Sequence, residues 1–166
     1  KGKTSMKSVG YKTPGPITAP DSFVDFTIPK PSPKGRDILV EVKAVSVNPV
    51  DVKVRASGKP ADGEHKVLGW DASGIVVDAG PGVELFMKGD AVWYAGSITR
   101  PGTNSEFHLV DERIVGAMPK SIGFAEAAAL PLTAITAWEM LFDRLDIRKP
   151  VPGAANAVLI IGGAGG

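Results

Sequence analysis

The last residues of the sequence carry a pattern that could bind a phosphate-rich cofactor. The apolar run AVLII at 157–161 leads into Gly162, Gly163, Gly165 and Gly166. Because glycine has no side chain, such a loop lets backbone N–H groups approach a pyrophosphate at the start of a following helix. Gly163 and Gly165 match the first two glycines of G-x-G-x-x-G, and the rest of that motif lies outside the sequence. A plain glycine-rich tail is the alternative, and these residues alone do not separate the two.

Few side chains in the sequence could bind zinc. The chain has no cysteine and only two histidines, His65 in a polar loop and His108 in a predicted strand. A catalytic zinc needs three protein ligands in a tetrahedral arrangement. The two histidines lack the i, i+4 spacing that would pair them on one helix face. We therefore expect no metal site, and we expect each histidine to be solvated or packed in the core.

The composition is that of an ordinary globular chain, and it excludes some classes of partner. The 166 residues are 43% hydrophobic and 22% charged, with a net charge of +1. This balance gives no reason to expect nucleic acid or an anionic membrane as partner, and no apolar run reaches the ~20 residues that span a bilayer. The absence of cysteine fits a reducing cytoplasm. We interpret residues 1–5 as the remnant of an expression tag and Met6 as the natural start.

Short strands separated by turns dominate the sequence up to Ser121. Ile38, Val40 and Val42 alternate with polar residues, which predicts a half-buried strand. Glycines interrupt the apolar run 67–79, as a bent barrel strand requires. The regular turn signals between strands predict a β-barrel-like domain. The predicted strands are 6–12, 23–28, 37–47, 67–79, 91–94 and 105–110.

Helical patterns begin after Ser121. The alanine-rich stretch 124–129 predicts a helix that Pro131 ends or kinks. A second helix is predicted over 133–145, with five apolar residues from Ile135 to Leu145 on one face. The run 157–161 suits a strand that is buried on both faces of a parallel sheet. The predicted fold class is therefore mainly β with some α.

Six blocks of sequence follow one another in an order and spacing that is specific when they are taken together. They are VSVNPVDVKVR (45–55), LGWDASGIV (68–76), KGDAVWYAG (88–96), GTNSEFHLVDERIV (102–115), AEAAALPLTAITAWEML (125–141) and AVLIIGGAGG (157–166). In these blocks the chain resembles the medium-chain dehydrogenase/reductase superfamily. Within it, the chain is most similar to quinone oxidoreductases and zinc-type alcohol dehydrogenase-like proteins. The resemblance covers residues 6–166.

The resemblance implies a domain organisation and a cofactor. It implies a GroES-like β-barrel catalytic domain over 6–123, junction helices over 124–156, and the first strand and glycine loop of a truncated Rossmann domain over 157–166. The family's active site lies between the two domains. The implied cofactor is NADPH in preference to NADH, with Gly163, Gly165 and Gly166 as its glycines. Relatives are often dimers, so a homodimer is one expected assembly.

The resemblance also shows that the zinc ligands are replaced. Zinc enzymes of the superfamily hold the metal with Cys, His and Cys beside a carboxylate, and their His lies in a Gly-His-Glu motif. This sequence has Gly69-Trp70-Asp71 at that motif, and it has Asn48 and Ala129 near the places of the two cysteines. None of these replacing side chains binds zinc. We therefore expect a zinc-independent site.

The resemblance gives four residues a role near the cofactor, and each role has a structural alternative. Asn48 matches the asparagine of a V-N-P-x-D motif beside the nicotinamide, although Asn48-Pro49 could be a simple turn. Asp51 matches the acid of that motif, or caps a short helix. Lys53 stands where many relatives carry a tyrosine close to the cofactor, or is simply exposed. Thr133 matches a threonine that touches the nicotinamide or its ribose, or is an N-cap.

Two aromatic residues complete the expected site and lead to a function. Trp70 forms a wall for a flat substrate or packs the core, and Tyr94 donates a hydrogen bond in the cleft. Without a Lewis acid, reduction of a simple ketone is poorly supported. In a quinone or an α,β-unsaturated carbonyl the charge left by hydride spreads over the conjugated system, so that a few donors suffice.

We therefore expect a zinc-independent NAD(P)H-dependent quinone or enone oxidoreductase, whose 166-residue fragment is itself inactive. The alternatives are a zinc-dependent alcohol dehydrogenase and a non-enzymatic GroES-like interaction or structural protein.

Overall fold

A computed structural model describes residues 4–149, 152–153 and 157–163 of the chain. The chain divides into two compact units, Lys1–Thr133 and Ala134–Gly166. We call the first the barrel unit and the second the C-terminal unit. The division falls after the helix at 124–128, which therefore belongs to the barrel unit.

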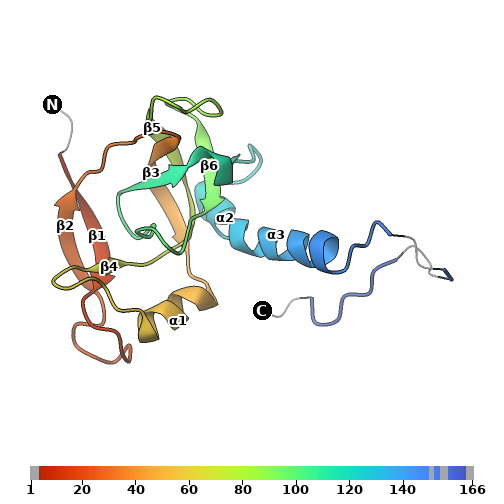
Figure 1. Ribbon diagram of the computed structural model, residues 1–166, viewed down its shortest axis with the longest axis horizontal. Coiled ribbons are helices and arrows are strands. Elements are labelled where there is room, and N and C mark those ends of the chain that lie inside the picture. Colours follow the sequence, from red (N-terminus) through yellow and green to blue (C-terminus); the bar gives the residue numbers. More distant parts are fainter. Residues whose placement is uncertain (1–3, 150–151, 154–156, 164–166) are drawn as a thin grey trace. The chain divides into compact units, whose positions relative to one another are not determined.

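The barrel unit is built from two antiparallel sheets (Figure 1). In the smaller sheet β1 (Ser5–Tyr11) lies between β2 (Val24–Pro29) and β4 (Lys66–Val67). The larger sheet has the order β7-β3-β5-β6-β8. Its strands are β3 (Asp37–Ser46), β5 (Asp71–Ala79), β6 (Ala91–Ala95), β7 (Phe107–Asp111) and β8 (Val115–Ala117), and a 3₁₀ turn, Glu112–Ile114, precedes β8. A bridge between Ser8 and Ser105 links the sheets. The predicted mainly-β architecture is confirmed.

The apolar core of the larger sheet explains why β3 forms where the alternating pattern predicts it. Ile38 and Val40 are fully buried together with Val76, Val92 and Val110. β3 lies between β5 and β7 and is therefore covered on both edges. Register shifts at Leu39/Val40 and at Val42/Ala44 interrupt the simple alternation, as β-bulges do.

The glycine-interrupted run 67–79 is two strands in the structure and not the single bent strand that we expected. β4 ends at Val67 in the small sheet and β5 begins at Asp71 in the large one. Gly69 lies between them with a φ of 96°, a conformation that L side chains rarely adopt. The chain therefore turns from one sheet into the other at this glycine.

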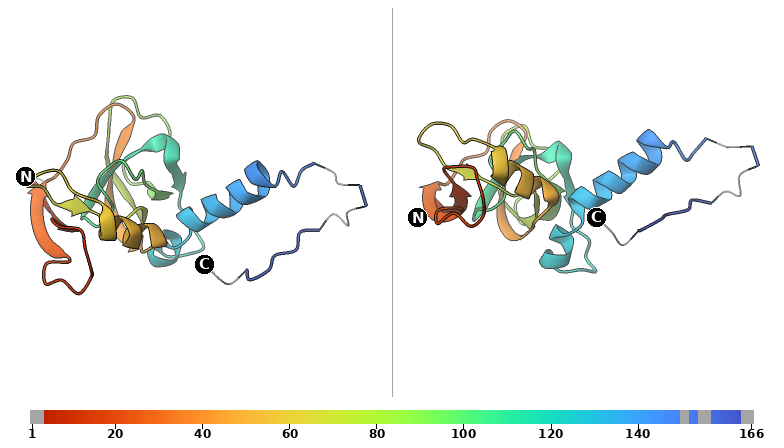
Figure 2. Two further views of the ribbon diagram at one scale, coloured as in Figure 1. Left: turned by 60° about the horizontal axis from the view of Figure 1, so that its bottom comes forward. Right: turned by 90° about the horizontal axis from the view of Figure 1, so that it is seen from below.

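The described residues form three α-helices in addition to the strands. α1 (Pro49–Ser57) lies at one end of the barrel strands in the views of Figures 1 and 2, and its Val50 and Val54 pack against a small core cluster. α2 (Phe124–Ala128) matches the first predicted helix, and Ser73 Oγ fastens it by donating to the Phe124 carbonyl at 2.6 Å. α3 (Pro131–Trp138) begins two residues before the predicted start, because proline is well suited to a first helical turn. A π-helical stretch, Glu139–Arg144, follows it.

The C-terminal unit lacks the strand that we expected over 157–161. Residues 157–161 form no strand, and the side chains from Val158 to Ile161 are exposed. A parallel strand needs neighbours on the same sheet, and no described residue of the chain supplies one. Trp138 contacts Phe142 within the helical part, with ring centroids 4.4 Å apart. Among the described residues, no helix combines the length and the apolar character that crossing a membrane requires.

Candidate functional site

Asn48 and Asp51 join the end of β3 to the start of α1. Asn48 is the N-cap residue, with Pro49 in the first helical turn. The Asp51 carboxylate accepts a hydrogen bond from the Asn48 backbone N–H at 2.8 Å and a second one from the Gly69 N–H at 3.0 Å. Asp51 therefore has the capping role and also ties α1 to the turn between β4 and β5. This contact places the N-P-x-D segment beside the Gly69-Trp70-Asp71 segment.

Asp71 is the centre of a buried polar cluster, which we call the Asp71 cluster: Asp71, Asn48, Ser46 and the Leu132 backbone N–H. The carboxylate is fully buried. Its Oδ2 accepts from Asn48 Nδ2 at 2.9 Å and from Ser46 Oγ at 3.2 Å, and its Oδ1 accepts from the Leu132 N–H at 2.9 Å. Burial raises the pKa of Asp71, and the three donors oppose this shift. The sequence indicates Asp71 only as part of the Gly69-Trp70-Asp71 motif, and no local pattern indicates its contact with Ser46.

The cluster fixes which way the Asn48 amide points. An ionised carboxylate only accepts hydrogen bonds, so the amide nitrogen and not its oxygen must face Asp71. One N–H of that nitrogen is used at 2.9 Å, and the other has a long 3.5 Å contact to Ser46 Oγ. Asn48 is 9% exposed. The Asn48 amide is therefore held in one orientation, firmly by Asp71 and weakly by Ser46.

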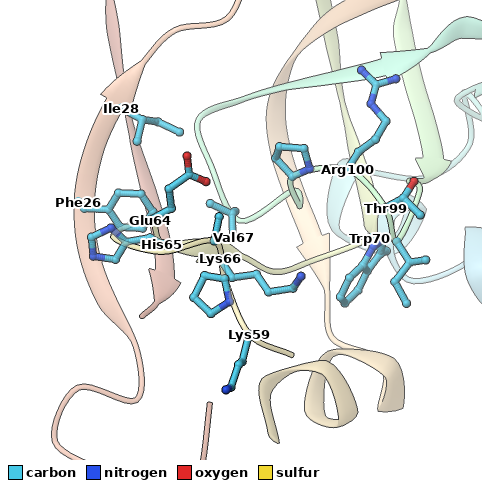
Figure 3. A pocket seen from close by; sticks show the side chains of 14 residues that line it. Phe26, Ile28, Lys59, Glu64, His65, Lys66, Val67, Trp70, Thr99 and Arg100 are labelled. Atoms are coloured by element: carbon cyan, nitrogen blue, oxygen red, sulfur yellow. The ribbon is translucent and has the colours of Figure 1, made fainter. Parts of the chain in front are cut away.

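Trp70 packs in the core, which is one of the two roles that the sequence left open. Its side chain packs with Tyr11 and Leu68 and is 3% exposed. It also lines a pocket of about 560 Å³ in the barrel unit (Figure 3). Within the described part of the chain, its indole N–H has no hydrogen-bond partner, which is uncommon for a buried donor.

The two basic residues of α1 differ in their environment. Lys53 is exposed, as its structural alternative predicts. Arg55 is buried, donates to the Ser22 carbonyl at 2.7 Å, and lies 4.6 Å from the centroid of the Tyr11 ring. Arg55 thus holds the loop before β2, and Lys53 is the one of the two that a ligand can reach.

The structure corrects the expectation that Tyr94 donates a hydrogen bond in the cleft. Tyr94 belongs to the barrel core and is 2% exposed, and its hydroxyl lies 3.0 Å from His108 Nδ1. His108 Nε2 lies 2.9 Å from the Pro101 carbonyl. Because a carbonyl only accepts, Nε2 carries the proton and Nδ1 accepts from Tyr94. Burial raises the pKa of Tyr94 and lowers that of His108 to about 4. We therefore assign Tyr94 to the interior.

The start of α3 brings a further expected residue near the Asp71 cluster. Thr133 follows Leu132 and donates its hydroxyl to the Leu130 carbonyl at 2.9 Å. It lies inside α3 and is not its N-cap. Gly163 is exposed, and Gly165 and Gly166 lie outside the described residues. The barrel unit thus brings together Asn48, Asp51, Trp70 and Thr133 of the expected set.

The donor chemistry at these positions does not fit zinc. No three His, Cys, Asp or Glu side chains among the described residues are grouped closely enough to hold a metal ion. The indole nitrogen of Trp70 is a donor only and cannot ligate. Both oxygens of Asp71 already accept hydrogen bonds.

Known proteins resemble the chain over most of its length. The family model for the alcohol dehydrogenase GroES-like domain matches residues 34–138. A zinc-type alcohol dehydrogenase-like protein of Staphylococcus epidermidis is 41% identical over 97% of this chain and 48% of its own length. The chain thus spans about half the length of such relatives.

Solved structures show the same relationship. A putative zinc-dependent alcohol dehydrogenase of Rhizobium etli is 68% identical with a TM-score of 0.90, over 95% of this chain and 46% of that one. The Escherichia coli quinone oxidoreductase complexed with NADPH is 25% identical with a TM-score of 0.69, over 84% of this chain and 41% of that one. The chain therefore belongs to the alcohol dehydrogenase GroES-like domain family, within the medium-chain dehydrogenase/reductase superfamily.

Proposed function

We propose that the chain is the catalytic barrel of an NAD(P)H-dependent oxidoreductase that works without zinc and reduces a quinone or an α,β-unsaturated carbonyl. The observation that carries the proposal is Trp70, which by resemblance stands at the place of the zinc-binding histidine and offers no lone pair to a metal. The adjacent carboxylate of Asp71 is occupied by three donors. A site without a Lewis acid suits an acceptor whose conjugation spreads the developing charge.

The proposed roles follow from the positions of the side chains. Reduced nicotinamide, when bound, supplies the hydride. Asn48, oriented by Asp71, donates its second N–H to the acceptor oxygen or to the nicotinamide, and Trp70 forms a wall for a flat ring. Its unsatisfied indole N–H supports a place beside a ligand. Asp51 positions Asn48 through the backbone, and Lys53 is an exposed contact for a cofactor phosphate or a proton donor.

The cofactor assignment draws on relatives and on the chain's own residues. Thr133 keeps its hydroxyl oxygen as an acceptor after donating to Leu130. Gly163, Gly165 and Gly166 are the proposed pyrophosphate glycines. The likeness to a quinone oxidoreductase complexed with NADPH supports NADPH in preference to NADH.

The test uses the protein extended to the length of its relatives. Absorbance of NADPH is followed with 1,4-benzoquinone, with benzalacetone, and with cyclohexanone as a simple ketone. We expect oxidation of NADPH by the first two and none by the third, with no loss of rate in a chelator. The names of two of the relatives favour a zinc-dependent alcohol dehydrogenase as second candidate. Stoichiometric zinc in elemental analysis, or no turnover with any quinone or enone, would overturn the proposal.

A further inference from the structure

The pocket that Trp70 lines carries side chains of different charge at its two ends. It is formed by β2, by the segment from Lys59 to Val67, by Trp70 and by residues 98–101. We call it the Lys66 pocket. Its volume of about 560 Å³ lies in the range of small-molecule sites. All lining residues belong to the barrel unit, so the pocket is complete within that unit.

The walls of the pocket are suited to a flat ring. Phe26 and His65 stack on one another with centroids 4.1 Å apart and planes inclined by 15°. Trp70, which also lines the pocket, lies on the other side of the view in Figure 3. Aromatic and proline walls favour a planar ligand, because such surfaces bury area against it at little cost in entropy.

The charged side chains of the pocket are distributed unevenly. Arg100 is neutralised by two hydrogen bonds to Asp37, at 2.9 and 2.8 Å. Figure 3 shows Lys59 pointing away from the other labelled side chains, whereas Lys66 extends in the direction of Trp70. In the view of Figure 3, Glu64 is on the same side of the pocket as Phe26 and His65. Within the described part of the chain, neither Lys66 nor Glu64 has an ion-pair partner.

We propose that the Lys66 pocket selects a flat acceptor that carries an anionic oxygen substituent, and that Lys66 holds this anion at the Trp70 end. Glu64 repels an anion from the opposite end, so the two charges together fix the orientation of the ligand. Trp70 joins the pocket to the Asp71 cluster, because it directly precedes Asp71 in the chain. The inference rests on the proposed function, which says that the ligand is an electron acceptor. It adds that this acceptor carries a negative charge.

Binding is measured on the 166-residue chain without cofactor. The probes are 4-carboxybenzalacetone and its methyl ester, which share the enone and differ in charge. The readout is the indole N–H signal of Trp70 in ¹H–¹⁵N spectra, identified among the three tryptophans as the signal that Trp70→Phe removes. We expect the acid to shift this signal and to bind about threefold or more tightly than the ester, since an exposed ion pair contributes modestly.

Three variants separate recognition of the charge from non-specific binding. Lys66→Gln should weaken binding of the acid about threefold and leave the ester unchanged. Glu64→Gln should strengthen binding of the acid, and Lys88→Gln, outside the pocket, should change neither. Equal affinity for acid and ester, an equal effect of Lys66→Gln on both, or shifts confined to residues 134–163 would overturn the inference.

Turnover by the extended protein distinguishes this inference from the proposed function. Equal kcat/KM for acid and ester would leave the reductase proposal standing and reject charge selection. Charge-selective binding without any NADPH oxidation would reject the reductase and retain the anion site.

Discussion

Two of the buried polar groups among the described residues of the barrel unit differ in construction: the Asp71 cluster and the Tyr94–His108 pair. In the pair, Tyr94 donates to His108 and His108 donates to Pro101, so every polar atom is satisfied inside the barrel. In the Asp71 cluster, Asn48 keeps one N–H with only a long contact. The pair has no donor left for a ligand, whereas the weakly engaged donor of Asn48 is the ligand contact that we propose. The comparison predicts that their variants separate stability from activity.

The largest expected effect is on turnover and comes from Asn48. In the extended protein, Asn48→Ala should lower kcat for quinone or enone reduction by about 10²-fold or more, as loss of a preorganised donor does at an oxyanion site. The measurement is NADPH oxidation under saturating substrate. Ser57→Ala, at the exposed end of the same helix, is the control. A wild-type rate in Asn48→Ala would show that the Asp71 cluster, like the Tyr94–His108 pair, does not act in turnover.

The second effect is a pH dependence of stability from the closed pair. The pKa of His108 is about 4 in the folded chain and about 6.5 in the unfolded chain. The unfolded state therefore binds more protons between these values, and the free energy of unfolding falls by about 3 kcal/mol as pH drops from 6.5 to 4.

Urea denaturation at several pH values tests this dependence. Between pH 6.5 and 4, His108→Gln should reduce the loss in the free energy of unfolding. His65→Gln should leave this loss unchanged. Asp71 gives stability a pH dependence of the opposite sign, because the pKa of its carboxyl is raised in the folded chain. Its contribution is complete below its unfolded pKa and is lost as pH rises through its folded pKa. A pH profile that His108→Gln leaves intact would contradict the lowered pKa of His108.

The sequence predicts the parts of this molecule whose causes are local. The alternation in β3 and the alanine-rich α2 depend on neighbouring residues, and the structure contains both. The Asp71 cluster depends on contacts between Ser46, Asp71 and Leu132, which are far apart in sequence. Tyr94 points inward because of how β6 pairs with β5 and β8, which no local pattern reveals. Residues 157–161 have a strand-like composition, yet a strand also needs a partner.

A smaller effect is expected from the acid at the centre of the Asp71 cluster. Asp71→Asn offers a single acceptor oxygen to three donors, so at least one buried N–H or O–H loses its partner. The free energy of unfolding at pH 7 should fall by about 2 kcal/mol, and the side-chain NH₂ signals of Asn48 should shift in ¹H–¹⁵N spectra. Asp78→Asn, on the exposed end of β5, is the matched control. Unmoved Asn48 signals would show that Asp71 does not orient this amide.

The smallest effect is expected from Tyr94. Tyr94→Phe keeps the ring in the core and removes one hydroxyl, which leaves His108 Nδ1 without its donor. The free energy of unfolding should fall by about 1 kcal/mol, as measured by urea denaturation at pH 7. The extended protein should keep its kcat and KM, because the hydroxyl is enclosed by the barrel and reaches no ligand. A large loss of kcat with little loss of stability would instead place Tyr94 in the catalytic machinery, and it would show that a buried, internally satisfied pair can still take part in proton transfer.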